Sequence, residues 1–115
     1  QQKESFFAWV DIEEFKHIPT ADYRRGKAMH IYHKYVRTNA VLQIGGISPE
    51  ERDHLERMIK ESQKDRSIVS TELFDNVQRR VFNEIYHNTY QRFLNSDLHK
   101  KMVNEVKNAY NKASG

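Results

Sequence analysis

The feature that most limits the fold of this chain is the spacing of apolar residues between Thr71 and Ser96. They recur every three or four positions, at Leu73, Phe74, Val77, Val81, Phe82 and Ile85. The positions between them are polar and include Gln78, Arg79, Arg80 and Glu84. An apolar stripe beside a polar face is typical of an amphipathic helix that packs onto a core. We therefore expect a core-facing helix here, and we predict that Phe82 is buried in the same core as Trp9.

Similar patterns divide the rest of the chain into helices and loops. No segment alternates apolar and polar residues long enough to indicate a strand, so the sequence predicts an all-α fold, an antiparallel helical bundle. A chain of 115 residues forms one modest core, and we expect a single domain over residues 1–112. The expected helices cover about residues 4–17, 21–37, 48–62, 71–87, 89–95 and 97–112, and residues 113–115 are expected to fray.

Local signals place some of these boundaries. The run Ser48-Pro49-Glu50-Glu51 combines an N-cap serine, a proline at the first helical position and a glutamate spaced for a capping box. The Gly45-Gly46 pair before it indicates a loop, because glycine tolerates backbone angles that other residues avoid. Asn88 or Thr89 can cap a short fifth helix.

Charge and composition exclude several classes of protein. The net charge is only +3 and basic residues are interleaved with acidic ones, which argues against a nucleic-acid-binding protein. The chain has no cysteine and no apolar run of the roughly 20 residues that a membrane span requires, so we expect no integral membrane segment and a cytoplasmic location. Between Lys16 and Arg37 six basic residues stand against one acid, Asp22. This stretch is either an ordinary solvated surface or a basic face that meets an acidic partner or an anionic membrane.

The sequence contains no recognisable catalytic motif. It lacks a phosphate loop, a nucleophile elbow, a zinc-protease helix and any cysteine nucleophile. His30 and His33 are three residues apart but have no nearby carboxylate partner in the sequence, so we expect no metal site. The chain is therefore not expected to be an enzyme or to need a cofactor.

A cluster of polar residues is better suited to protein binding. Asn88, Thr89, Gln91 and Arg92 gather amide, hydroxyl and guanidinium groups at a predicted helix start. Arg92 is the strongest candidate, because a guanidinium makes planar, directional contacts that a lysine cannot make. The residues alone leave a simpler alternative, in which Asn88 caps the helix and Arg92 forms a surface ion pair.

Four segments follow one another along the chain: ESFFAWVDIEEFKHI, KAMHIYHKYV, LFDNVQRRVF and TYQRFLNS. Together they resemble the regulator of G-protein signalling (RGS) domain family. ESFFAWVDIEEFKHI is similar to the family's ENIxFWxxCEEYKKI helix, and KAMHIYHKYV is similar to its AxxIYxxFI helix. Ala40 and Ile44 resemble the loop that follows, while LFDNVQRRVF and TYQRFLNS resemble the penultimate and closing helices. The resemblance runs from Glu4 to about Val103 and implies the family's antiparallel helical bundle.

The resemblance implies a domain that binds the switch regions of an activated G-protein α subunit (Gα) and speeds its GTP hydrolysis. Such domains supply no catalytic residue, because Gα itself holds the glutamine that orients water and the arginine that stabilises charge. They act by binding the transition-state arrangement of the switches more tightly than the ground state. By resemblance, the Gα-binding positions are Glu4, Ser5, Gly45, Glu84, Asn88, Thr89, Gln91 and Arg92.

The chain departs from the family pattern at several of these contacts. Two family asparagines fall on Ser5 and Gly45, an aspartate falls on Asn88, and an apolar contact falls on Glu84. Only Arg92 and the small hydroxyl of Thr89 match well, and Glu4 matches in part. We therefore expect the fold with weak Gα recognition and little GTPase acceleration. The alternative is a scaffold of this fold that binds another protein.

The chain also differs from the family in the helices that it contains. The family's short helices before the first matching segment have no counterpart here, and in the family they pack with the last helices. We therefore expect apolar surface on the final helix, covered by residues 103–110 themselves or by another chain. The oligomeric state stays open.

Overall fold

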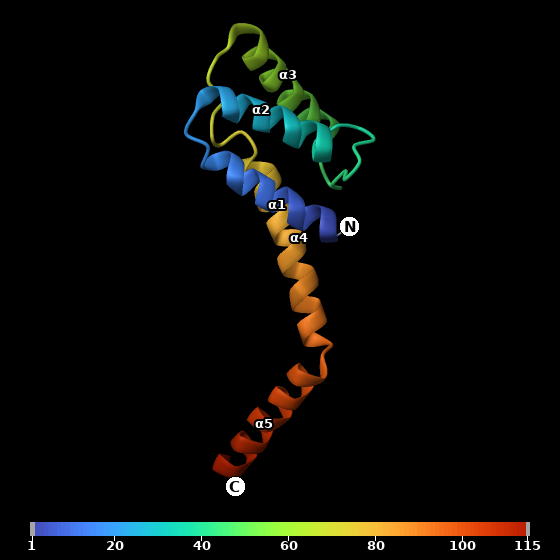
Figure 1. Cartoon of the computed structure of the whole chain (residues 1–115). Helices are drawn as coiled ribbons and strands as arrows, with labels where there is room; N and C mark the ends of the chain where they lie inside the picture. Colours follow the sequence, from blue (N-terminus) through green and yellow to red (C-terminus); the bar gives the residue numbers. More distant parts are fainter. Residues whose placement is uncertain (1, 115) are drawn as a thin grey trace.

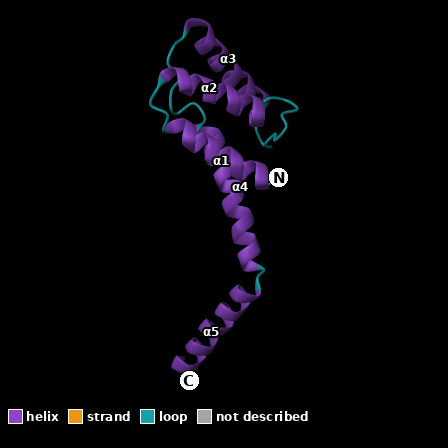
Figure 2. Ribbon diagram, viewed as in Figure 1, coloured by secondary structure: helices purple, strands orange, loops and turns teal. Residues whose placement is uncertain are grey.

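A computed structural model describes residues 2–114, and their regular structure is entirely helical (Figure 2). The all-α fold predicted from the sequence is confirmed. In chain order the elements are α1 (Gln2–Lys16), α2 (Ala21–Ile31), a π-helical turn η1 (Tyr32–Val36), α3 (Pro49–Asp65), α4 (Asp75–Leu94) and α5 (Asp97–Ser114).

The helices form a packed body and a projecting arm (Figure 1). In the body, residues 2–81, α1 packs against both α2 and the first part of α4, and α3 packs against α2 and η1. The arm, residues 82–114, consists of the rest of α4 and of α5. Its first turn still contacts α1 through Glu84, and the remainder projects away from the packed helices. The molecule is therefore elongated, with principal extents of 73 × 30 × 20 Å.

The core lies entirely in the body. Among the described residues, the last buried apolar side chain in the sequence is Val81. Phe15 of α1 meets Phe74 edge to face, with ring centroids 5.2 Å apart, and both rings are fully buried. Full burial of an apolar side chain of this size contributes about 1.5–3 kcal/mol. The cluster draws on every element of the body, with Ala8, Ile12, Phe15, Ala28, Ile31, Tyr32, Tyr35, Val36, Ile44, Ile47, Leu55, Ile59, Val69, Phe74, Val77 and Val81.

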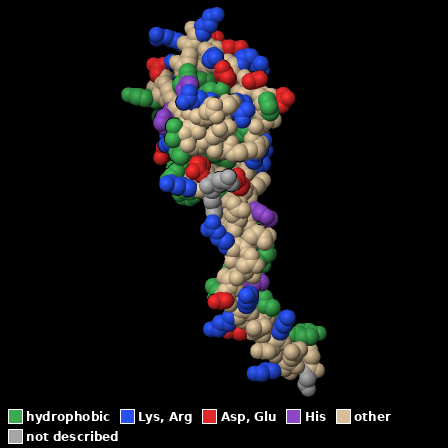
Figure 3. Space-filling model, turned by 90° about the vertical axis from the view of Figure 1, so that its right-hand side faces the viewer, with side chains coloured by type: hydrophobic (Ala, Val, Ile, Leu, Met, Phe, Trp, Pro, Cys, Tyr) green, Lys and Arg blue, Asp and Glu red, His purple; other side chains and the backbone are tan. Residues whose placement is uncertain are grey.

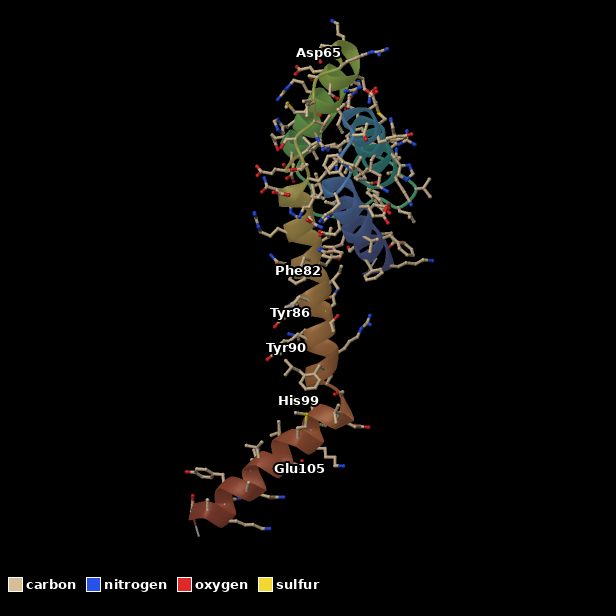
Figure 4. The ribbon with its side chains drawn as sticks, turned by 60° about the vertical axis from the view of Figure 1, so that its left-hand side comes forward. Asp65, Phe82, Tyr86, Tyr90, His99 and Glu105 are labelled. Atoms are coloured by element: carbon tan, nitrogen blue, oxygen red, sulfur yellow. The ribbon has the colours of Figure 1, made fainter. Side chains whose placement is uncertain are left out.

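The prediction that Phe82 is buried is wrong. Its side chain is 51% exposed, whereas Trp9 is half-buried and packs against the core. Phe82 follows Val81 by about 100° around the helix, so it points away when Val81 faces inward. It stacks instead on Tyr86, which stacks on Tyr90, and the three rings line one side of α4 (Figure 4).

The predicted break between two helices near Asn88 is also wrong. Residues 75–94 form one uninterrupted helix, so the predicted helices at 71–87 and 89–95 are a single element that begins after a turn at 71–74. Asn and Thr cost less than about 0.7 kcal/mol each in a helix interior, and no glycine or proline occurs between Thr71 and Ser114 to stop the helix. The chain turns instead at Asn95 and Ser96, and the Ser96 hydroxyl accepts the backbone N–H of His99 at 3.1 Å.

Other boundaries differ from prediction by a few residues. The element predicted over 21–37 changes to the π-helical turn after Ile31. The helix predicted over 48–62 continues to Asp65, where Arg66 takes a left-handed conformation with φ 56°. Fraying was predicted from residue 113, but α5 continues to Ser114, and Gly115 lies outside the described residues.

The N-terminus of α3 confirms one half of the predicted capping box. The Ser48 hydroxyl accepts the backbone N–H of Glu51 at 3.1 Å, and Pro49 occupies the first helical position. The Glu51 carboxylate, however, accepts a hydrogen bond from Arg80 Nη1 of α4 at 2.7 Å. In a complete capping box, the Glu51 carboxylate would accept the backbone N–H of Ser48. Arg80 is the donor instead, because a hydrogen bond within an ion pair is stronger.

The basic stretch between Lys16 and Arg37 is largely neutralised within the molecule. Lys27 Nζ lies 3.2 Å from Asp11 and 3.0 Å from Glu14, and Arg25 is buried, where it donates to the backbone carbonyls of Arg66 and Ser67. On the face seen in Figure 3, basic and acidic side chains are interspersed over the body. These contacts favour the ordinary surface over a cationic patch.

Candidate protein-binding surface

The antiparallel pairing of α1 with α4 creates the first part of the site. Gln78 Nε2 donates to Glu13 Oε1 at 2.9 Å, and Ser5 Oγ donates to Glu84 Oε2 at 3.2 Å. The hydrogen bond from Gln78 lowers the pKa of Glu13 below its ordinary value. Because 79 positions separate Ser5 from Glu84, only the fold brings the two together.

The loop between η1 and α3 forms the second part. Ile44 is buried, and its backbone N–H donates to the Tyr35 carbonyl at 3.0 Å, which fixes the loop against the end of η1. Gln43 Oε1 accepts the backbone N–H of Asn39 at 3.1 Å. These anchors hold the exposed Gly45 beside α1 and α4.

The two glycines of this loop have different roles. Gly46 has φ 79°, a backbone conformation that favours glycine, and a Cβ there would make a tight contact of 3.2 Å with the Arg80 side chain. A Cβ built on Gly45 meets no atom within 4 Å, and its φ lies outside the left-handed region. Gly45 is therefore not needed for the fold, and its lack of a side chain leaves open space at the surface.

That space belongs to a cleft of about 240 Å³ lined by Ser5, Gln43, Ile44, Gly45 and Glu84. Three of the predicted site residues, Ser5, Gly45 and Glu84, thus come from three separate elements into one place. Gln43 was not predicted as a site residue. Its position two residues before the loop's first glycine was the available signal.

The other predicted residues lie around this cleft and along the arm. Glu4 is half-buried directly before Ser5, and Asn88 is half-buried one helical turn beyond Glu84. Thr89, Gln91 and Arg92 are exposed on the same helix. A helix start was expected to bring Asn88, Thr89, Gln91 and Arg92 together. The structure has no helix start there, so these four residues are interior positions of α4.

Comparison with known proteins decides the family. A family model described as "Regulator of G protein signaling domain" matches residues 1–102. The chain belongs to the RGS domain family. It is similar to human "Regulator of G-protein signaling 21", at 29% identity over 96 residues, which are 84% of this chain and 58% of that protein. It is also similar to rat "Regulator of G-protein signaling 1", at 28% identity over 104 residues, 90% of this chain and 46% of that protein.

The RGS match has a definite extent. The chain spans about half the length of the curated relatives it matches. The match ends at Met102, so residues 103–114 of α5 lie outside it. All eight residues predicted for the site lie within the matched region, and three of them, Ser5, Gly45 and Glu84, line the cleft.

The structure holds neither a metal cluster nor a membrane-spanning helix within residues 2–114. No group of three or more His, Asp or Glu side chains there is arranged to bind a metal ion. None of the helices described is both long and apolar enough to cross a membrane. The cleft of this RGS domain is lined by the hydrogen-bonding side chains of Ser5, Gln43 and Glu84, together with Ile44 and Gly45.

Proposed function

We propose that this RGS domain binds an activated Gα subunit through the cleft formed by Ser5, Gly45 and Glu84 and through the adjoining α4 surface, with Asn88, Thr89, Gln91 and Arg92. The family regulates G-protein signalling, and the proposal assigns that role to named residues here. It implies a cytoplasmic location with recruitment to the membrane by the partner.

The observation that carries the proposal is the convergence of α1, the loop at Gly45 and α4 on one cleft. The resemblance places Gα contacts on all three elements. A surface assembled from distant parts of the chain is rigid when each part is anchored, as here by the Ser5–Glu84 hydrogen bond and by buried Ile44. Rigid surfaces bind without the entropy cost of ordering loops.

On this proposal the domain contributes binding energy and no reacting group. Gα holds the residues that orient water and stabilise charge, so a partner accelerates hydrolysis by holding the switches in the reactive arrangement. The residues described offer hydrogen-bond donors and acceptors around the cleft, which fits that role.

We infer from three positions that the domain accelerates GTP hydrolysis only weakly. Gly45 has no side-chain amide to offer to the switch glutamine. The Ser5 hydroxyl already donates to Glu84, and Asn88 carries no charge. Each lost polar contact at a buried interface costs roughly 1–3 kcal/mol. The same departures favour the second candidate, a scaffold of RGS fold that binds a different protein.

Single-turnover GTP hydrolysis by Gαi with micromolar domain tests the proposal. We expect acceleration far below that of human Regulator of G-protein signaling 21, used as the comparison domain. Gly45→Asn should raise the rate, because the open space accepts a side chain without a clash. Arg92→Ala should lower it.

The control for Arg92→Ala is Arg57→Ala, since Arg57 is an exposed arginine on α3. We expect the control to leave the rate unchanged. Acceleration equal to that of the comparison domain would refute the prediction of weak activity. If Arg92→Ala and Gly45→Asn alter neither binding nor hydrolysis with any Gα subunit, the scaffold becomes the better assignment.

A further inference from the structure

We propose that the Ser5–Glu84 cleft selects a partner that inserts a cationic side chain, an arginine or a lysine, and that Glu84 is the residue that determines this specificity. The inference rests on the proposed function in one respect only, namely that the cleft faces a protein partner. It goes further by naming the chemistry that the partner must present.

The size of the cleft limits what can enter. Its volume of about 240 Å³ is below the roughly 300–1,000 Å³ of ordinary small-molecule sites. It corresponds to the liquid volume of about eight water molecules at ~30 Å³ each. One long side chain fits such a space. The open position above Gly45, where no atom lies within 4 Å of a built Cβ, provides the entrance.

The polar side chains that line the cleft are those of Ser5, Gln43 and Glu84, and Ser5 and Glu84 offer hydrogen-bond acceptors. Glu84 contributes a carboxylate. Ser5 Oγ donates a hydrogen bond to that carboxylate and can still accept one through its lone pairs. Ile44 supplies an apolar wall from the core side. Acceptors beside an apolar wall complement the aliphatic stem and the cationic end of arginine or lysine.

No basic side chain of residues 2–114 neutralises Glu84. Among residues 2–114 its hydrogen-bond partner is Ser5, and no lysine or arginine of that range forms an ion pair with it. Arg80, about one turn earlier on α4, is paired with Glu51 at 2.7 Å. Glu84 is nevertheless half-buried, so a partner that covers it removes much of its remaining water.

Covering an uncompensated carboxylate is unfavourable, and that cost creates the specificity. An apolar or acidic group placed over Glu84 leaves a buried charge without a partner. A cation placed there pairs with the carboxylate, and the attraction between the two charges strengthens as water leaves. Where the family pattern has an apolar contact, this chain therefore rejects the partners that suit such a contact and favours basic ones.

The direct test uses small probes and two-dimensional ¹H–¹⁵N NMR of the whole chain. N-acetyl-arginine amide should shift the Ser5 and Gly45 amide signals at roughly tenfold lower concentration than N-acetyl-citrulline amide, its neutral analogue of the same shape. In Glu84→Gln, which retains an acceptor for Ser5, the two probes should behave alike. Equal behaviour in the wild-type chain, or shifts confined to other surfaces, would overturn the inference.

A second measurement separates this inference from the proposed function. Binding of the wild-type chain, Glu84→Gln and Arg92→Ala is compared over a panel of Gα subunits carrying GDP and aluminium fluoride. If Arg92→Ala weakens binding but Glu84→Gln does not change the order of preference, Gα binding stands and the cationic selection is wrong. If no Gα subunit binds while the arginine probe still distinguishes the wild-type chain from the Glu84→Gln variant, the cleft assignment stands and the partner is a different protein.

Discussion

The body and the arm share one helix, α4, but its apolar residues are buried in the body and mostly exposed in the arm. In the body, Val77 and Val81 are buried against α1 and the core. Directly after Val81, Phe82 is 51% exposed, and Tyr86, about one turn further, is 62% exposed. Apolar spacing is the same kind of signal in both regions. What differs is the presence of another described helix to cover it, which a single helix's pattern cannot reveal.

The surface area of the molecule reflects the same contrast. The chain exposes 8097 Å², whereas a compact monomer of 13.8 kDa exposes about 6,600 Å². The arm contributes to the larger area, because none of the described residues of α5 is buried. This helix carries exposed apolar side chains at four-residue spacing, at Leu98, Met102, Val106 and Tyr110. The expected apolar surface on the final helix is present, and residues 103–110 do not cover it.

The largest expected effect tests the contrast with two phenylalanines. Phe15→Ala should destabilise the chain by about 3–5 kcal/mol, because the ring is fully buried against Phe74 and leaves a cavity. Phe82→Ala should cost about 1 kcal/mol or less, since only its stacking on Tyr86 is lost. Urea unfolding of both variants measures the difference. Similar losses would mean that the arm is packed in solution.

The second prediction concerns Asp11, which ties α1 to η1 and α2. Burial opposes its ionisation, but hydrogen bonds from Tyr35 at 2.5 Å and Lys27 at 3.2 Å outweigh this and lower the pKa of Asp11. A lowered pKa stabilises the fold above the ordinary value of about 3.9, and that contribution is lost as the pH falls through the folded value. Asp11→Asn should therefore cost about 1–3 kcal/mol at pH 7.

The pH series provides the check. The stability difference between Asp11→Asn and the wild-type chain should be constant from pH 7 to pH 5 and should shrink below about pH 3.9. Burial and the Asp11 hydrogen bond raise the pKa of Tyr35, so that contribution is present at neutral pH and is lost only as the pH rises beyond about 10. A variant as stable as the wild-type chain at pH 7 would show that the network contributes little.

The sequence predicted what depends on local chemistry and on family likeness. The all-α fold, the start of α3 at Ser48 and the convergence of Ser5, Gly45 and Glu84 are examples. It failed where a competing long-range contact decides the outcome. Glu51 pairs with an arginine of α4 and does not complete the capping box, and nothing local shows this.

Asn88 illustrates a different failure. Asparagine is a good N-cap, but a cap forms only if the chain leaves the helix there, and no glycine or proline favours such an exit. The helix therefore continues through Asn88 to Leu94. The predicted site residues beyond Glu84 are placed along the arm as a consequence.

A smaller effect is expected at the start of α3. Ser48→Ala should destabilise the body by about 1 kcal/mol, because the backbone N–H of Glu51 loses its acceptor at 3.1 Å. Ser48→Asp serves as the matched variant, since its carboxylate also caps and should retain most of the stability. Thermal unfolding of the three proteins decides this. Equal stability of the alanine variant would show that water replaces the cap without cost.

The smallest expected effect comes from removing α5 altogether. Ending the chain after Ser96 should change the free energy of unfolding by about 0.5 kcal/mol or less, because none of the described residues of α5 is buried. The helix contacts α4, for example through the His99 ring against Phe93. Urea unfolding of the shortened and the full chain measures this at several protein concentrations. A loss of several kcal/mol that does not depend on concentration would mean that α5 folds back onto the body of its own chain. A loss that grows with concentration would instead mean that the exposed side chains of α5 meet another molecule, since association stabilises the folded state by mass action.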